Sequence, residues 1–341
     1  MHPLINLISD TVTRPTPDML SAMMRATVGD DVFQEDPTVN ELQAYAASLF
    51  GMEAALFCPS GTMTNQIALQ VHCGRLEEVI CDKLSHIFQY ETGGYASNGG
   101  IPIQLLDGTN GKLIAEQVQA AIRPDYDWLP TSRLVVLENT CNKGGGSYYT
   151  LPEMQAIREV TEAHGLKLHL DGARLFNALA ETGDTPEAIG ATFDTISICL
   201  SKGLGAPVGS LLLGSHEDMR QARRLRKAMG GGMRQAGYLA AAGLYALQHH
   251  RDRLAEDNRH AALLADTVRQ LPYVIDVRPV RSNILIFDLE ETLTAEAFLE
   301  RLKSHGILAA PFGPHTVRFV THYDVSAEQI ERVREVLERG V

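Results

Sequence analysis

Cysteine is scarce in this chain of 341 residues, and the few cysteines present follow no pattern that would hold a fold together. There are five, an odd number, and none are spaced as CxxC, so we expect neither a disulfide framework nor a zinc site. We expect no other bound metal. Unpaired thiols are typical of a reducing compartment, so we expect a cytoplasmic protein.

Long apolar runs are also missing. The longest, at residues 239–247, is interrupted by Gly243 and is typical of a buried helix rather than a membrane span. The first residues, MHPLINLISD, lack the basic and apolar regions of a signal peptide. We therefore expect no association with a membrane.

Positive charge is in deficit. The chain has 30 Lys and Arg against 42 Asp and Glu, a formal net charge of −12. Such a charge disfavours binding to nucleic acid or to an anionic membrane, so we expect no nucleic-acid partner. Any anionic ligand must be held by a local cluster of positive groups.

What the chain does contain is the composition of an ordinary globular protein, with 45% hydrophobic and 21% charged residues. Strand-like apolar runs alternate with helical patterns from residue 36 to 214. Because near-continuous apolar strands joined by helices form sheets covered on both faces, we predict an α/β fold with a mostly parallel mixed sheet. The strands are predicted at residues 54–59, 78–82, 133–139, 166–171 and 195–201.

The C-terminal part of the chain has an α+β pattern. Strand-like runs there are VIDVRP, SNILIFDL and TVRFVTH, with helices predicted at 294–305 and 326–338. We predict a large domain over residues 1–250, whose N-terminal segment contacts substrate, and a smaller α+β domain over residues 251–341.

Ser60-Gly61-Thr62 lies between a predicted strand and a predicted helix. The free backbone N–H groups and dipole of such a helix start suit a phosphate, with the Thr62 hydroxyl as a further donor. The same tripeptide is also ordinary turn and N-cap chemistry. On this segment alone, the second interpretation is favoured.

Asp171 ends another predicted strand, in HLDGAR, and Arg174 follows three residues later. Buried carboxylates are uncommon unless they are paired. Arg174 could be the partner in a purely structural ion pair. Alternatively, Asp171 faces a protonated ring nitrogen while Arg174 binds an anionic oxygen.

Lys202 follows the apolar run of SICLSKGLGAPVGS, at the end of a third predicted strand. It could simply reach water with its flexible stem. In open α/β sheets, however, ligands bind beyond the carboxyl ends of the strands, where all three candidates fall. A lysine for a Schiff base, a carboxylate for a pyridine nitrogen and a helix start for a phosphate together indicate pyridoxal 5′-phosphate.

Two further features are weaker indications of function. The basic stretch RQARRLRK is typical of a solvated helix face, although it could reach a phosphate or a neighbouring subunit. The pair His249-His250 lacks carboxylates at metal-binding spacing and is expected at the surface.

With these residues in place, the sequence resembles the low-specificity L-threonine aldolases, pyridoxal-phosphate enzymes with the aspartate-aminotransferase-like fold, type I. The resemblance extends over nearly the whole chain. The segments that carry the resemblance are LISDTVTRPTPDM, GDDVFQEDPTVNELQ, CPSGTMTNQ, DKLSHIFQYE, LENT, LHLDGARLFNA, SICLSKGLGAPVGS and GGGMRQAG, with VRFVTH less densely matched.

The resemblance implies roles at matching positions. Lys202 would bond the cofactor, Asp171 would face its pyridine nitrogen, and His86 would stack on its ring and take part in catalysis. A homotetramer built from dimers with shared active sites is also implied. The resemblance also implies that Ser60, Gly61 and Thr62 contact the phosphate. The implied contacts of the substrate carboxylate are Ser9, Arg174 and Arg318, and Arg174 would also contact the cofactor. Arg234 and, less surely, Lys227 would contact the phosphate of a partner subunit.

The implied reaction is retro-aldol cleavage of L-threonine, L-allo-threonine and related amino acids to glycine and an aldehyde. Cys141 and Trp128 stand at or near positions where many relatives have histidine, and Phe33 stands where a tyrosine is common. These departures leave open a preference for aromatic substrates such as phenylserine. Other open alternatives are β-elimination, transamination or racemisation on the same scaffold, and a non-catalytic cofactor-binding protein.

Overall fold

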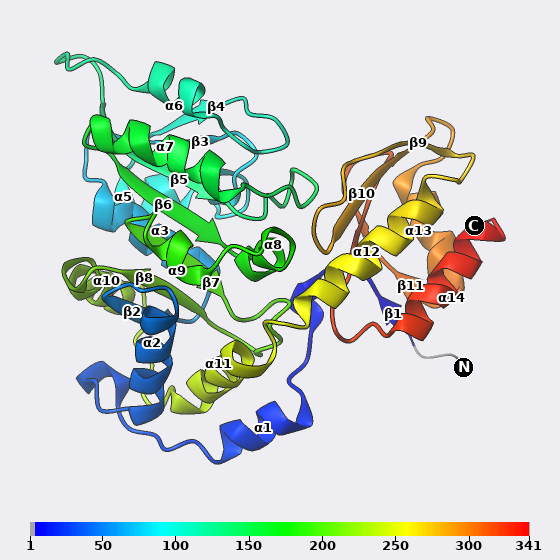
Figure 1. The fold of residues 1–341 in the computed structure, drawn as a ribbon, viewed down its shortest axis with the longest axis horizontal. Coiled ribbons are helices and arrows are strands. Elements are labelled where there is room, and N and C mark those ends of the chain that lie inside the picture. The colour runs from blue at the N-terminus through cyan, green and yellow to red at the C-terminus, as the bar shows by residue number, and fades with distance from the viewer. Residues whose placement is uncertain (1–3, 341) are drawn as a thin grey trace.

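The computed structural model describes residues 4–340 and has two lobes of unequal size (Figure 1). The larger lobe is built on a seven-stranded sheet with the order β2-β8-β7-β6-β5-β3-β4. Neighbouring strands are parallel, except that β8 runs antiparallel to β2 and β7. The strands are β2 (Ala54–Cys58), β3 (Glu77–Asp82), β4 (Ile103–Leu106), β5 (Thr131–Glu138), β6 (Lys167–Gly172), β7 (Thr195–Cys199) and β8 (Ser210–Gly214).

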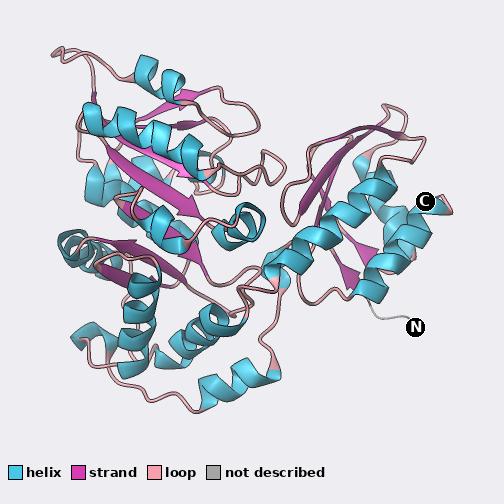
Figure 2. Ribbon diagram, viewed as in Figure 1, coloured by secondary structure: helices cyan, strands magenta, loops and turns pink. Residues whose placement is uncertain are grey.

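The five predicted strands of this sheet are confirmed, with ends that differ by at most two residues. Helices lie on both sides of the sheet (Figure 2). Apolar side chains alternate between the two faces: Val135 and Leu137 pack into one core, whereas Leu134 and Val136 pack into another. The predicted mostly parallel mixed sheet with both faces covered is therefore confirmed.

The helices of the larger lobe begin where the sequence supplies caps. Asp36 accepts a hydrogen bond from the Val39 N–H at 3.1 Å, and Thr150 and Glu153 form a capping box. The elements are the 3₁₀ turns η1 (Asp10–Val12) and η2 (Asp31–Phe33), and the helices α1 (Pro17–Met24), α2 (Pro37–Leu49), α3 (Gly61–His72), α4 (His86–Gln89), α5 (Gly94–Gly99), α6 (Ala115–Ala121), α7 (Leu151–Ala163), α8 (Leu175–Thr182), α9 (Pro186–Gly190), α10 (His216–Ala228) and α11 (Gly237–His249).

The smaller lobe contains a four-stranded antiparallel sheet with the order β12-β13-β10-β9. Separately, the N-terminal strand β1 pairs in parallel with β11, and Ile5 and Leu7 pack into the core of this lobe. The elements are β1 (Ile5–Asn6), α12 (Leu254–Val268), β9 (Val274–Val277), β10 (Ile284–Leu289), α13 (Ala295–Ser304), β11 (Ile307–Leu308), β12 (Ala310–Pro311), β13 (Thr316–Val320) and α14 (Ala327–Glu338).

A domain boundary near residue 250 stays a proposal. It lies just before α12, the helix that runs from the larger lobe into the smaller one in Figure 1. The N-terminal strand, however, is part of the smaller lobe's core. This segment of the proposed large domain therefore packs in the smaller lobe. Within residues 4–340, no helix combines the length and the apolar character that crossing a bilayer requires.

The predicted surface position of His250 is wrong. Its side chain is buried, and its Nδ1–H donates a hydrogen bond to the Leu204 carbonyl at 2.8 Å. The hydrogen bond to this carbonyl allows the ring to be buried, although the sequence pattern alone predicts that it is exposed to water.

We expect Phe287→Ala to destabilise the smaller lobe by about 3–5 kcal/mol. Phe287 is fully buried and packs edge-on against Phe298 and Phe319, so truncation leaves a cavity. Urea denaturation measures the change. The control Ile275→Ala removes an exposed side chain of β9 and should shift stability by less than about 0.5 kcal/mol. Equal losses in the two variants would contradict this packing.

Candidate functional site

A cavity of about 390 Å³ lies between the carboxyl ends of the large sheet's strands and the edge of the smaller lobe. Five of the predicted site residues line it: Ser9, His86, Arg174, Lys202 and Arg318. They come from segments far apart in the chain, and β12 and β13 supply the wall from the smaller lobe. The cavity therefore contains both the lysine and the arginines that the sequence singles out.

Lys202 lies in the turn that follows β7. The Thr13 hydroxyl and the Gly205 N–H both donate hydrogen bonds to the Lys202 carbonyl, at 2.9 and 2.8 Å. Gly205 has φ +81°, and a Cβ there would lie 2.6 Å from the Tyr323 ring, so this turn requires glycine. Among residues 4–340, no group is hydrogen-bonded to the Lys202 ammonium, which leaves the amine available to a ligand.

Asp171 is buried near the end of β6, with 3% of its surface exposed. Its oxygens accept hydrogen bonds from Asn65 Nδ2 at 2.8 Å and from the Ala173 N–H at 3.2 Å. Within the described residues, no lysine or arginine forms an ion pair with it. A buried carboxylate without a cationic partner fits a ligand that brings its own positive charge.

The structural ion pair between Asp171 and Arg174, one of the two alternatives drawn from the sequence, is wrong. Arg174 instead pairs with the fully buried Asp10, with two parallel N–H···O contacts of 2.7 Å. Asp10 was not predicted, because its partner lies 164 residues away and only the fold brings them together. Burial opposes ionisation of Asp10, but the charge and hydrogen bonds of Arg174 lower its pKa to about 2.

Arg318 on β13 lies across the cavity. Its two terminal nitrogens donate to Asn142 Oδ1 and the Ile8 carbonyl, both at 3.1 Å, whereas its buried Nε has no partner. Burial and the nearby charge of Arg174 lower the pKa of Arg318. Within the described residues Arg318 forms no ion pair, so its charge can serve an anionic group such as a substrate carboxylate.

His86 begins α4 and lines the cavity. Its ring Nδ1 lies 2.9 Å from Glu91 Oε1, and its backbone N–H donates to Glu138 Oε2 at 2.8 Å. Burial lowers the pKa of His86, but the Glu91 hydrogen bond and the nearby carboxylates outweigh it and raise the pKa overall.

Glu138 was also not predicted as a site residue. It ends β5 in register with Asp171 and lines the cavity. Burial and the charge of Asp171 raise its pKa to about 7, so this carboxyl can exchange a proton near neutral pH. The signal that could have found it is a carboxylate at the end of a predicted strand, the same signal that marks Asp171.

Ser60, Gly61 and Thr62 do not line the cavity but form the start of α3, whose next turn supplies Asn65 to Asp171. Ser60 Oγ caps the Met63 N–H at 3.2 Å. The fully buried Ser210 hydroxyl has no hydrogen-bond partner and lies 3.5 Å from the position of a Cβ on Gly61. An unsatisfied hydroxyl beside a helix N-terminus fits a phosphate.

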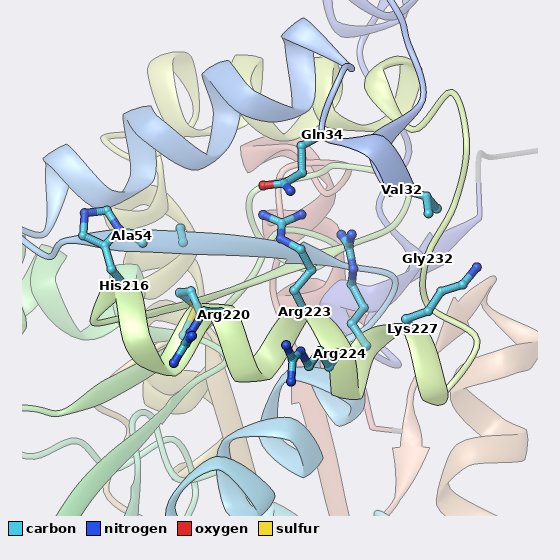
Figure 3. A pocket seen from close by; sticks show the side chains of 12 residues that line it. Val32, Gln34, Ala54, His216, Arg220, Arg223, Arg224, Lys227 and Gly232 are labelled. Carbon is cyan, nitrogen blue, oxygen red and sulfur yellow. The ribbon is translucent and has the colours of Figure 1, made fainter.

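Arg234 and Lys227 do not reach the cavity of their own chain. The Arg234 side chain is 56% exposed and pairs with Asp30 at 2.8 Å. Lys227 belongs to a separate groove of about 600 Å³ along α10 (Figure 3). No Asp or Glu is among the residues that line this groove, and its cations are His216 (when protonated), Arg220, Arg223, Arg224, Arg226 and Lys227.

The interpretation of this basic stretch as a solvated helix face is wrong at Arg226. Its side chain is 2% exposed, donates to the Phe57 carbonyl at 2.6 Å and forms an ion pair with Asp31 at 2.7 Å. Arg220 and Arg224 are exposed.

Comparisons with known proteins agree with this geometry. A family model described as "Beta-eliminating lyase" matches residues 6–292. The chain is 45% identical over 333 residues to the low specificity L-threonine aldolase of Escherichia coli K12, covering 97% of each chain. It is 41% identical to low-specificity L-threonine aldolase 1 of Arabidopsis thaliana, over 96% of this chain and 93% of that protein. The solved threonine aldolase of Leishmania major has the same fold, with a TM-score of 0.85 at 24% identity over 98% of this chain and 99% of that one.

We expect Asp10→Asn to destabilise the protein by about 3–5 kcal/mol at pH 7, because Arg174 is then buried without its counter-charge. The folded-state pKa of Asp10, about 2, lies below its ordinary value of 3.8. The stabilisation is therefore present above pH 4 and lost as the pH falls towards 2.

Denaturation of both proteins across this pH range measures the difference. Asp266→Asn, which breaks the exposed ion pair with Arg269, is the matched control and should cost less than about 1 kcal/mol. A loss for Asp10→Asn that is small, or that does not shrink in acid, would contradict the assignment.

Proposed function

Since the chain belongs to the low-specificity L-threonine aldolase family, we propose that it cleaves L-threonine, L-allo-threonine and related L-β-hydroxy-α-amino acids to glycine and an aldehyde. The cofactor is pyridoxal 5′-phosphate. The observation that carries the proposal is 45% identity to an aldolase over 97% of both chains, with Lys202 lining a cavity after β7 and Asp171 near the end of the neighbouring strand β6.

When bound, pyridoxal phosphate supplies a ring that accepts the electron pair released from the Cα–Cβ bond. The role we propose for Asp171 is to hold a positive ring nitrogen, which favours that electron flow. Lys202 would supply the amine that attaches the cofactor. The N–H groups at the start of α3 and the Ser210 hydroxyl would hold its phosphate.

We propose that the substrate carboxylate binds between Arg318 and the nitrogen of Arg174 that Asp10 does not use. Ser9, on the same wall, would add a hydroxyl donor. His86 is proposed to stack on the cofactor ring, supported by its place on the cavity wall and its tether to Glu91.

Product analysis tests the reaction. Purified protein is incubated with threonine, allo-threonine and phenylserine, and glycine, aldehyde, keto acid and enantiomer are measured. Glycine with an equal amount of aldehyde supports the aldolase. A keto acid would indicate transamination or elimination, an inverted amino acid would indicate racemisation, and no turnover would indicate a binding protein.

We further propose that the active site is shared between subunits of a dimer, and that two dimers form a tetramer. Arg234 and Lys227 lie outside their own cavity, and the groove of α10 exposes positive charge without lining carboxylates. Both features support contact with the phosphate site of a partner subunit. A cytoplasmic location is proposed from the five cysteines, which are all buried and unpaired.

We expect Lys202→Ala to lose at least about 1,000-fold in turnover, because no amine remains to attach the cofactor. Borohydride treatment should fix the cofactor covalently to the wild-type protein and not to the variant. Lys303→Ala, which replaces an exposed side chain on α13, is the control. Retained turnover in Lys202→Ala would remove the lysine assignment.

Arg318→Ala should raise KM for threonine by about 10–100-fold while the cofactor stays bound, since a charged hydrogen bond to the carboxylate is lost. Steady-state kinetics and cofactor absorbance measure the two effects. Arg332→Ala, on α14, is the control. An unchanged KM would refute the proposed carboxylate contact.

Mixed dimers test the shared site. Lys202→Ala and Arg234→Ala should each be nearly inactive alone, but co-expression should restore about a quarter of wild-type activity, because half of the dimers then contain one intact site. No recovery in verified mixed dimers would place Arg234 outside the partner's site.

A further inference from the structure

Asn65 connects two carboxylates at the candidate site. It is 2% exposed, and its Nδ2 donates to Asp171 Oδ2 at 2.8 Å and to Glu91 Oε1 at 2.9 Å. An amide nitrogen carries two hydrogens, so both are used by these anions. The opposite amide orientation would direct an oxygen at two carboxylates. The orientation of Asn65 is therefore fixed, with Oδ1 pointing away from the site.

The orientation of Asn65 determines the protonation of His169. Asn65 Oδ1 can only accept, and His169 Nε2 lies 3.3 Å from it, so Nε2 carries the hydrogen. His169 is fully buried, and burial lowers its pKa to about 3, so the ring is neutral at physiological pH. Its Nδ1 then has no hydrogen and must accept one.

The donor to His169 is Thr195, whose hydroxyl lies 2.8 Å from Nδ1. This hydroxyl has one hydrogen, which is used by His169, so its oxygen accepts from His72 Nε2 at 2.9 Å. The chain of hydrogen bonds therefore runs in one direction, from His72 at the end of α3 through Thr195 and His169 to Asn65. Every donor in it points towards the two carboxylates.

One oxygen of Asp171, one oxygen of Glu91 and one ring nitrogen of His86 all lie within 4.8 Å of one another. The two carboxylates repel each other, and the Asn65 amide nitrogen is hydrogen-bonded to both. We propose that Asn65 is a positioning residue whose two N–H groups hold the Asp171 carboxylate in place, and apart from Glu91, before the cofactor binds. This inference rests on the proposed role of Asp171 towards the cofactor ring.

Neutron diffraction of the cofactor-free protein in D₂O at pH 7 tests the chain directly. The expected result is deuterium on His169 Nε2 and His72 Nε2, the Thr195 deuterium directed at His169 Nδ1, and no deuterium on Asp171 or Glu91. Deuterium on His169 Nδ1, or a proton shared by Asp171 and Glu91, would overturn the proposal. This measurement involves neither cofactor nor turnover, so it can fail or succeed independently of the proposed reaction.

The variant Asn65→Leu tests the consequence, because leucine has the same number and branching of side-chain heavy atoms and neither donates nor accepts. The affinity of the cofactor-free protein for pyridoxal phosphate should fall by at least 10-fold at pH 7. Asn258→Leu is the matched control, since Asn258 is also buried and hydrogen-bonded but touches Asn177 and Glu181 instead. It should leave the affinity unchanged.

A folded Asn65→Leu protein with wild-type affinity would contradict the positioning role. So would an equal loss of affinity in Asn258→Leu, since that would make the effect one of general packing. If Asn65→Leu does not fold, the neutron measurement on the unaltered protein decides.

Discussion

The buried ion pair between Asp10 and Arg174 holds the parts of this molecule in their relative positions. Asp10 belongs to the N-terminal segment, Arg174 to the turn after β6 of the larger lobe, and Asn283 of the smaller lobe donates to the same carboxylate at 3.1 Å. The pair therefore connects three parts of the chain beside one cavity. Both groups are removed from water, so burying either charge without the other would strongly destabilise the fold. This is why the two side chains stay paired.

The candidate site follows from that arrangement and from the parallel order of β5, β6 and β7. Parallel strands deliver their carboxyl ends to one edge of the sheet, so Glu138, Asp171 and Lys202 meet although they are distant in sequence. The smaller lobe adds Arg318 from β13. The larger lobe thus holds the groups suited to the cofactor, and the boundary between the lobes holds those suited to a substrate carboxylate.

The local elements and the strand-end residues could be predicted from the sequence, because they depend on apolar periodicity, caps and short motifs. Strand β8 (SLLLG) was missed because it directly follows the small residues after Lys202, which read as a turn. The partner of Arg174 was missed for a different reason. Asp171 is three residues away and Asp10 is 164, and only the tertiary fold decides between them. Glu91 and the hydrogen bonds around Asn65 likewise depend on contacts between elements, whereas Glu138 ends a predicted strand and carried the same signal as Asp171.

The most direct measurement is a crystal structure of the protein with pyridoxal phosphate and glycine. The account predicts electron density joining the cofactor's aldehyde carbon to either Lys202 Nζ or the glycine nitrogen. It also predicts the ring nitrogen within hydrogen-bond distance of Asp171 and the glycine carboxylate against Arg318. A cofactor bound in another cavity, or one whose ring nitrogen faces away from Asp171, would contradict the account.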